Sequence, residues 1–352
     1  MNKITTVGVD LAKEVIVVCA GDAAGQVVCL RQFSFQGFAA WAANLSPCSF
    51  GMEACSSAHY WARWLTGQGH SAQLMAAEFV KPFRKSQGAK NDRNDAQAIR
   101  IAMCQPQMRF VAVKSVEQQA MLAWHRMRSG YNEERTALIN RTRGLLAEFG
   151  VWLGRSAAAL IRALPRLVQE QDLPARFRPL LQHAHEQLLV LEERIATCDQ
   201  QIKAHARQSE AAQRISALSG IGPLTSRAVV ATVANAGDFR NGRQMAAWIG
   251  LVPRQSSSGG KDRLGVITKR GDTYLRGLLT QGARSTLQAA LTRPAEKCSH
   301  LQHWIVALHA RVGYHKTLVA IANKHVRIIW AILAKGETYD PNAWQRYAPA
   351  RP

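Results

Sequence analysis

The sequence has little cysteine, and its cysteines are scattered. The seven Cys residues form no C-x-x-C pair, the spacing typical of structural zinc sites and thiol redox motifs. No run of about 18 apolar residues occurs, so no membrane-spanning helix is predicted. The first ten residues, MNKITTVGVD, lack the apolar core of a signal peptide. These features exclude a disulfide scaffold and predict a reduced cytoplasmic protein with no membrane partner.

Acidic residues are also scarce. The chain has 24 Asp and Glu against 45 Lys and Arg, which gives a formal net charge of +21. The excess is greatest in residues 240–352, where 18 Lys and Arg stand against 5 Asp and Glu. A basic surplus of this size costs free energy in self-repulsion and indicates a polyanionic partner, nucleic acid rather than membrane.

A length of 352 residues allows two or three domains. Apolar β-branched runs at residues 4–9 and 14–20, followed by a third at 26–33, predict a strand meander. Further strands are expected at 50–52, 72–76 and 108–113, with a helix at 56–65 between the first two. Consecutive strands followed by alternating helices and strands are typical of a mixed α/β domain, which we place at residues 1–115.

Residues 116–212 are predicted to be helical. Two apolar patterns carry this prediction, one from Ala120 to Leu145 and a cleaner heptad seam from Leu181 to His205. Pro165, Pro174 and Pro179 interrupt the region between them, where two helices could reverse direction. The seam fits two alternatives, a coiled-coil dimerisation arm or a helical hairpin packed within its own chain. Its members are Leu181, Ala184, Leu188, Leu191, Ile195, Cys198, Ile202 and His205.

The third region, residues 213–340, is predicted to be mostly α-helical. Helices are expected at 271–291, 297–312 and 315–335. Its start, around Gly220 and Gly222, reads as the hairpin of a helix-hairpin-helix, in which glycines let backbone N–H groups approach a DNA phosphate. A plain tight turn is the alternative. The fold class is therefore α/β followed by α.

Four carboxylates stand where metal-dependent phosphodiester chemistry could use them. Asp10 ends the first strand, Glu53 ends a later one, and Asp92 and Asp95 lie three residues apart at the start of a helix. Paired divalent ions need several such oxygen ligands. The alternative for each is a helix cap or a solvated charge. Cations that could hold phosphate beside them are Lys81, Arg84, Lys85, Lys90 and Arg93.

A run of three serines and two glycines, Ser256 to Gly260, places hydroxyls in a cationic segment. A serine that attacks phosphorus needs activation and nearby positive charge to stabilise the developing oxyanion. From composition alone, such a run is more often a flexible loop. The cations that follow it, predicted to bind nucleic acid, are Lys261, Arg263, Lys269, Arg270 and Arg276.

Five segments, taken in order, resemble the DEDD insertion-sequence transposases, a family that includes Piv-type invertases and bridge-RNA-guided serine recombinases. The segments are TVGVDLAKEV, GMEACSSAHYW, KNDRNDAQAI, SGIGPLTSRAVVATV and WIGLVPRQSSSGGKDRLGVITKRGDTYLRGLLTQGAR. The resemblance covers nearly the whole chain. It implies a RuvC-like, RNase H-type first domain whose Asp10, Glu53, Asp92 and Asp95 bind Mg²⁺. It also implies a C-terminal transposase domain with a serine nucleophile.

In the family this serine precedes a glycine, shortly after a G-L-x-P turn. Here the turn is Gly250 to Pro253, and Ser258 matches best, while Ser257 and, less well, Ser256 stay open. The resemblance further implies a phosphoserine link to DNA, a structured guide RNA, and dimers or tetramers in which protomers share the site. The heptad seam would serve that assembly.

Two other functions compete with recombination. The first is a Holliday-junction-type endonuclease that uses only the four carboxylates to activate water. The second is a nucleic-acid-binding protein that has lost its chemistry. The presence of all four acids and of the serine run argues against the second.

Overall fold

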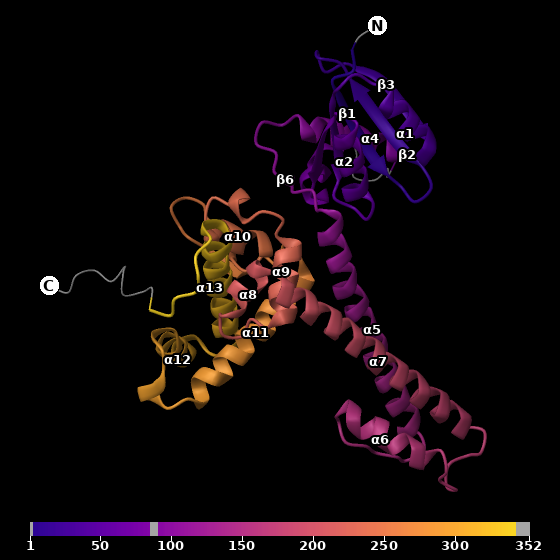
Figure 1. Cartoon of the computed structure of the whole chain (residues 1–352), viewed down its shortest axis with the longest axis vertical. Coiled ribbons are helices and arrows are strands. Elements are labelled where there is room, and N and C mark those ends of the chain that lie inside the picture. The colour runs from indigo at the N-terminus through magenta and orange to yellow at the C-terminus, as the bar shows by residue number, and fades with distance from the viewer. Residues whose placement is uncertain (1–2, 85–90, 343–352) are drawn as a thin grey trace, which may run out of the picture. The chain divides into compact units, whose positions relative to one another are not determined.

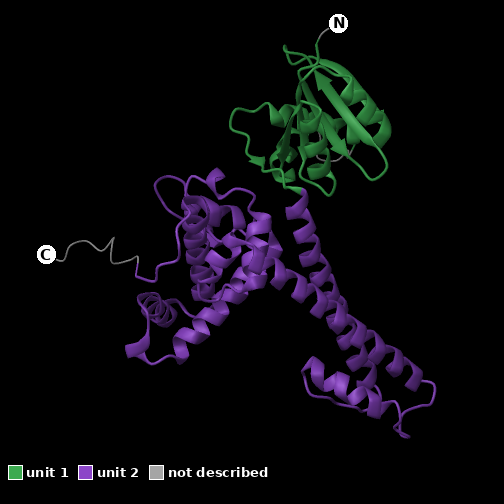
Figure 2. Cartoon of the chain, viewed as in Figure 1, with its two compact units in different colours: residues 1–115 green, residues 116–352 purple. Residues whose placement is uncertain are grey.

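The computed structural model describes residues 3–84 and 91–342. The chain divides into two compact units, residues 1–115 and 116–352, shown in separate colours in Figure 2. The sequence predicts domain boundaries near residues 115 and 212. The second of these lies inside the second unit, where Met121 and Ile202 of the predicted arm pack with Ala231 of the following region.

A six-stranded mixed sheet forms the first unit (Figure 1). Its spatial order is β3-β2-β1-β4-β5-β6. The first three strands make the predicted antiparallel meander, β4 and β5 continue parallel to β1, and β6 closes the edge antiparallel to β5. The bounds are β1 (Thr6–Leu11), β2 (Ile16–Gly21), β3 (Val27–Phe33), β4 (Ser49–Glu53), β5 (Ser71–Met75) and β6 (Phe110–Val111).

Helices cover both faces of the sheet, in an arrangement consistent with an RNase H-like fold. The apolar core on one face joins α1 (Phe35–Ala43) and α2 (Ala58–Gly67) to strand residues such as Val18. On the other face, Val17 packs against α4 (Asp92–Met103). Two short segments, α3 (Ala77–Val80) and the 3₁₀ turn η1 (Lys81–Phe83), precede α4. The alternation of strand side chains between faces sorts them into these two layers.

Helix α1 was not predicted, because its segment carries no charge and contains Gly37 near its start. In the structure Gly37 lies in the first turn, where its N–H donates to the Ser34 hydroxyl at 3.1 Å. Ser34 is therefore the N-cap. Phe38 and Ala42 of this helix are fully buried against the sheet, so tertiary packing and not charge patterning fixes the element.

The second unit begins with three helices, α5 (Val116–Ala147), α6 (Ala157–Leu167) and α7 (Arg178–Gln208). The heptad seam of α7 is used inside the chain: Leu181, Leu188 and Leu191 form one apolar cluster with α5 and α6. Figure 1 shows α5 and α7 running side by side. The seam is thus the core of an intramolecular hairpin, and a dimerisation role for it has no support here.

Two details of the predicted helical region are wrong. The apolar pattern from Ala120 to Leu145 predicts burial of Met127, Leu138 and Leu145. Of these only Leu138 is buried, and the buried stripe of α5 includes Met121 and Leu146 instead. The polar residues His125 and Thr142 also belong to the buried stripe. The helical period of the stripe is therefore not visible from the apolar residues alone. Pro165, predicted to interrupt the chain, lies inside α6.

The remainder of the second unit is mostly helical, as predicted, with one unpredicted hairpin of strands. The helices pack around a core that α11 and α13 share with α8, α9 and α10. The bounds are α8 (Glu210–Ser216), α9 (Pro223–Thr232), η2 (Ala236–Asp238), α10 (Gly242–Ile249), β7 (Pro253–Gln255), β8 (Leu264–Ile267), α11 (Thr273–Thr292), η3 (Ala295–Lys297), α12 (His300–Val312) and α13 (Tyr314–Lys335).

Helix α13 is the one helix in the described part of the chain that is long and apolar enough to cross a membrane. By composition alone this is weak evidence, because core helices pass the same test. Ile321, Val326 and Ile329 of α13 are fully buried in the helical core, so packing within the unit accounts for the apolar character.

His325 lies at the centre of this core and gives a prediction for pH-dependent stability. It is fully buried, and both ring nitrogens lack a hydrogen-bond partner among the described residues. Burial lowers the pKa of His325 from 6.5 to about 4. The unfolded chain therefore takes up a proton below about 6.5 while the folded chain does not, so stability present above that pH is lost as the pH falls toward 4. Between pH 7 and 4, the wild type should lose about 3 kcal/mol more unfolding free energy than His325→Leu, measured by urea unfolding.

His315→Leu is the matched control, because His315 is exposed on the same helix. It should keep the wild-type pH dependence. If the unfolding free energies of the wild type and His325→Leu changed equally with pH, the prediction for His325 would be contradicted.

Candidate functional site

The sheet brings Asp10 and Glu53 together. Strands β1 and β4 are neighbours and parallel, with Val9 paired to Met52. The next residue on each strand is a carboxylate, so Asp10 and Glu53 stand side by side at the carboxyl ends of two adjacent strands. Both side chains are partly accessible. The sequence prediction that two strand ends supply these acids is consistent with this register.

Two glycines let α4 lie close to the same strands. A Cβ on Gly8 of β1 would collide with the backbone of Ala96 and Arg100, and one on Gly51 of β4 would collide with Met103. Because α4 approaches the sheet so closely, its first turn carries Asp92 and Asp95 toward the strand ends. Asp95 is buried and Asp92 is exposed.

The charges of these four carboxylates act on one another. The pKa of Asp10 is raised from 3.8 to about 6, first by burial and then by repulsion from Asp95, Asp92 and Glu53. Burial also raises the pKa of Glu53, an effect that Arg84 opposes. Repulsion among grouped carboxylates is the condition that a bound cation relieves.

Arg84 supplies a positive charge within this group. Its Nη2 lies 3.3 Å from Glu53 Oε1, and its Nε lies 3.0 Å from Asp95 Oδ1. From the sequence, Arg84 is predicted to bind phosphate. Its contact with two site acids could not be predicted, because no spacing rule links residue 84 to residue 53. The guanidinium holds the two acids from different elements in one place.

The donor set suits a hard divalent ion, since all four ligands are carboxylate oxygens. With Arg84 in contact with Glu53 and Asp95, however, no three His, Cys, Asp or Glu side chains in the described ranges are grouped closely enough to hold a metal ion. The residues therefore fit Mg²⁺ by the chemistry of their donor atoms, while Arg84 contacts two of the four carboxylates in this structure.

Of the other cations predicted beside this site, Lys81 in η1 and Arg93 in α4 are exposed. Lys85 and Lys90 lie outside the described residues. Lys81 and Arg93 remain candidates for phosphate contact.

The serine run forms the turn of a β-hairpin, not a flexible loop. Strands β7 and β8 pair antiparallel, and beyond them Ser258 bridges to Lys261. The two residues between, Gly259 and Gly260, have φ of +57° and +74°. Positive φ at both central positions defines a type I′ turn, which suits the twist of the strands and favours glycine. The Gly-Gly pair between the segments that form β7 and β8 was the sequence signal that could have predicted the hairpin.

The hairpin separates the serines by face. Ser257 Oγ donates to Asp262 Oδ1 at 3.0 Å and accepts from Gln255 Nε2 at 3.0 Å. Because side chains alternate along a strand, Ser256 and Ser258 share the opposite face with Lys261 and Arg263. No hydrogen bond of the Ser258 hydroxyl is found within the described chain.

The remaining cations of this region differ in what they contact. Lys269 and Arg270 are exposed, and Lys269 adopts φ of +54°, an uncommon backbone conformation for a residue with a side chain. Arg276 instead donates to the carbonyls of Ile249 and Arg270 at 3.0 and 2.8 Å. Its guanidinium thus connects the end of α10 to the segment before α11, a structural role in place of the predicted contact with nucleic acid.

The predicted helix-hairpin-helix segment is a turn between α8 and α9, and its two glycines have different surroundings. Gly220 has φ of +81°, and a Cβ there would collide with the carbonyl of Gly282 and the hydroxyl of Thr286. Thr286 Oγ1 also donates to the Ser219 carbonyl at 2.9 Å. Gly222 is exposed at the N-cap of α9. Packing against α11 accounts for Gly220, while Gly222 is free to meet a phosphate.

This difference predicts opposite outcomes for two alanine substitutions. Gly220→Ala should lower the free energy of unfolding by at least about 2 kcal/mol, because it adds strain at positive φ to a collision with backbone. Gly222→Ala should change it by less than about 1 kcal/mol, since its Cβ would meet nothing within 4 Å. Chemical denaturation of both variants tests this, and equal losses would contradict it.

Comparison with known proteins shows similarity along almost the whole chain. Residues 7–150 match a family model for DEDD transposases of the IS110 type, and residues 212–298 match the model "Transposase IS116/IS110/IS902 family". A "Probable family 20 transposase" of Pseudomonas aeruginosa is 46% identical, over 96% of this chain and 99% of that protein. The transposase for insertion sequence element IS1111A of Coxiella burnetii is 40% identical, over 96% of this chain and 92% of that protein. The transposase for IS1328 of Yersinia enterocolitica is 34% identical, over 96% and 99%.

Proposed function

Because the chain belongs to the IS116/IS110/IS902 family of transposases, enzymes that cut and rejoin DNA, we propose that it does so through a covalent link between a serine and DNA. The observation that carries the proposal is the hairpin, which presents Ser258 at a defined turn, on the face of Lys261 and Arg263. Such a position gives a hydroxyl both exposure and positive charge.

In the proposed reaction the Ser258 Oγ attacks a phosphorus atom of one DNA strand and forms an ester bond to it. The bond from that phosphorus to the neighbouring sugar oxygen breaks, and this oxygen leaves as a free hydroxyl with a proton. Attack by the hydroxyl of another strand then releases the serine, so that one phosphodiester is exchanged for another. Lys261 and Arg263 stabilise the negative charge that develops on the phosphoryl oxygens.

Asp10, Glu53, Asp92 and Asp95 are proposed to hold Mg²⁺, which would supply Lewis-acid stabilisation of phosphate charge when bound. The mutual repulsion of these carboxylates supports this assignment, because their grouping costs free energy unless a cation is present. Arg84 meets that need when no metal is bound.

We further propose a structured guide RNA and an oligomeric active complex, a dimer or a tetramer in which protomers share the site. The resemblance supports both, and the net charge of +21 suits two nucleic-acid partners. The proposed oligomer does not use the heptad seam, which is buried within the chain. If base pairing with the guide RNA selects the DNA sequence, the protein needs to recognise only the backbone and the shape of the nucleic acids. We also propose that it acts in the cytoplasm.

The test is a denaturing gel of protein incubated with Mg²⁺, labelled element-junction DNA and RNA transcribed from the element's flank. A labelled band that migrates with the protein supports the serine link. Cleaved DNA with no such band would favour the alternative, a metal-dependent junction endonuclease that activates water.

A further inference from the structure

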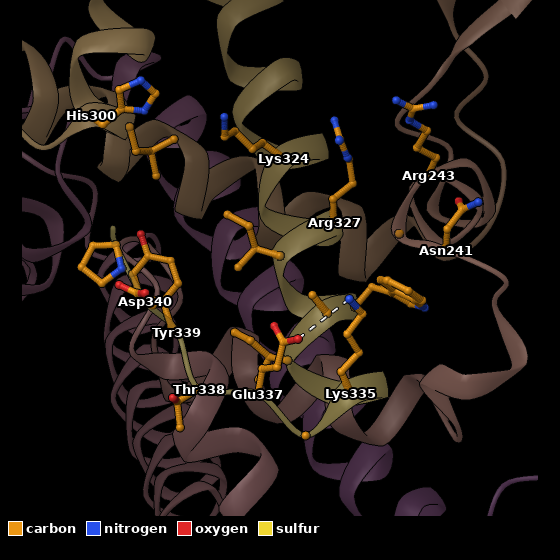
Figure 3. Close-up of a pocket in the computed structure, with 18 residues that line it drawn as sticks. Asn241, Arg243, His300, Lys324, Arg327, Lys335, Glu337, Thr338, Tyr339 and Asp340 are labelled. Atoms are coloured by element: carbon orange, nitrogen blue, oxygen red, sulfur yellow. Dashed lines mark ion pairs between the residues drawn. The ribbon is translucent and has the colours of Figure 1, made fainter. Parts of the chain in front are cut away.

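A cavity of about 1030 Å³ opens in the second unit, and neither the serine hairpin nor the α8–α9 turn lines it. It is lined by the first turn of α10, the start of α12, the second half of α13 and the residues that follow α13 (Figure 3). Its volume lies at the upper end of the range of small-ligand sites. None of its residues belongs to a motif that the proposed function uses.

Three cations gather on one side of the cavity. Lys324 and Arg327 come from successive turns of α13, and Arg243 comes from the first turn of α10, as Figure 3 shows. Gly242 makes this grouping possible, because a Cβ there would collide with the backbone of Arg327. The two helices therefore meet at that point, and residues far apart in sequence bring their charges together.

These charges are not neutralised within the described part of the chain, where no carboxylate forms an ion pair with any of the three. The pKa of Lys324 is lowered by burial and by the neighbouring charge of Arg327. Two carboxylates also line the cavity, and both lie apart from the three cations (Figure 3): Glu337, which pairs with Lys335 at 3.8 Å, and Asp340. Holding three cations together in this way costs free energy that an anionic ligand would recover.

Aromatic and polar groups complete the lining. Trp330 is held in place by hydrogen bonds from its Nε1 to the carbonyls of Ala236 and Phe239, both at 3.1 Å. Tyr339 lines the same cavity. The first turn of α10 adds the partial positive charge of a helix start. A cationic groove beside aromatic rings is the usual composition of a site for a single nucleic-acid strand, in which phosphates meet cations and unpaired bases stack.

We infer that this cavity binds an unpaired segment of a nucleic-acid strand, with its phosphates on Arg243, Lys324 and Arg327. A duplex does not fit the inference, because its bases are stacked inside and a rigid helix cannot enter a cavity. DNA and RNA single strands share the required chemistry. The choice of ligand rests on the proposed nucleic-acid function, but binding here needs neither metal nor cleavage.

The test measures binding by the full chain in EDTA, with three probes: a single-stranded DNA, an RNA of the same sequence, and the duplex of that DNA. The first variant is Lys324→Gln/Arg327→Gln. The second is Arg243→Gln on a different helix, which keeps the test valid should the first fail to fold. The matched control is Arg311→Gln/Lys316→Gln, which removes two exposed cations of α12 and α13 outside the cavity lining.

The α13 double variant should weaken single-strand binding about tenfold or more near 0.1 M salt, and should reduce the salt slope by about 0.7 per lost phosphate contact. Arg243→Gln should show a smaller loss of the same kind, and the control should change little. A loss confined to RNA or to DNA supports the inference and names the strand. A loss confined to the duplex, or equal losses in the control, would overturn it. Because no cleavage is measured, this result is independent of the covalent-adduct test.

Discussion

Replacing Ser258 by alanine is expected to remove the covalent protein–DNA band from a denaturing gel completely. The hydroxyl is the atom that would form the ester to phosphorus, and no neighbouring group can take its place from the same face of the hairpin except Ser256, two residues away. Affinity for DNA and RNA should stay within about twofold, since a neutral hydroxyl releases no counterion. The measurement is the adduct yield with labelled junction DNA, beside a binding curve for the same variant.

Ser257→Ala is the matched control, because it removes the hydroxyl of the adjacent residue, which lies on the opposite face of the hairpin. That hydroxyl accepts from Gln255 and donates to Asp262, so its loss should loosen the hairpin and lower the yield without abolishing the band. The reverse pattern would assign the nucleophile to Ser257, with Asp262 as its general base. Asp262→Asn then separates the two cases: it should abolish the band if Ser257 attacks, and reduce it only modestly if Ser258 does.

The spatial arrangement of the hairpin residues could not be predicted from the sequence. Ser258, Lys261 and Arg263 could be selected from the sequence as residues of suitable chemistry, but their relation could not. The pairing of residue 257 with residue 262 depends on the turn type, and the type I′ turn depends on positive φ at Gly259 and Gly260. In a flexible loop, the side chains of these residues would have no fixed faces. In the hairpin, side chains alternate between two faces, so Ser257 lies beside Asp262, while Ser256 and Ser258 lie on the face of Lys261 and Arg263.

The carboxylate site was more accessible to prediction. Acids at the ends of strands and at the start of a helix are local features, and adjacent parallel strands place Asp10 beside Glu53 without any further contact. What local patterns could not supply is Arg84, whose partners are 31 and 11 residues away. In the same way the heptad seam was correctly read as a buried helix face, while its partner, α5 in the same chain, was a question of tertiary packing.

Asp10→Asn is expected to abolish metal-dependent cleavage and, at the same time, to stabilise the protein without metal. The loss of a ligand should lower the rate of cleavage by about a thousandfold or more, equivalent to several kcal/mol of transition-state stabilisation. The gain in stability has a different cause. Burial and the charges of Asp95, Asp92 and Glu53 raise the pKa of Asp10 to about 6, so an ionised carboxylate at this position destabilises the fold at neutral pH, and an amide does not.

The pH dependence of this gain follows from linkage. Above about pH 6 the wild-type carboxyl is ionised in both folded and unfolded states, and the penalty is complete. As the pH falls from 6 toward the ordinary value of 3.8, the folded carboxyl is protonated first and the penalty disappears. The Tm of Asp10→Asn in EDTA should therefore exceed that of the wild type at pH 7.5, with the difference shrinking on acidification.

Thermal melting with and without Mg²⁺ provides a readout that does not depend on cleavage. The wild type should gain Tm with Mg²⁺, because a ligand that binds the folded state stabilises it, and Asp10→Asn should gain almost nothing. Glu14→Gln is the control, since it removes an exposed carboxylate of the same unit and should keep both the Mg²⁺ response and the Tm of the wild type. An undiminished Mg²⁺ response in Asp10→Asn would remove Asp10 from the metal site. A lower Tm in EDTA would instead mean that Arg84 and Asp10 stabilise each other more than the carboxylates repel.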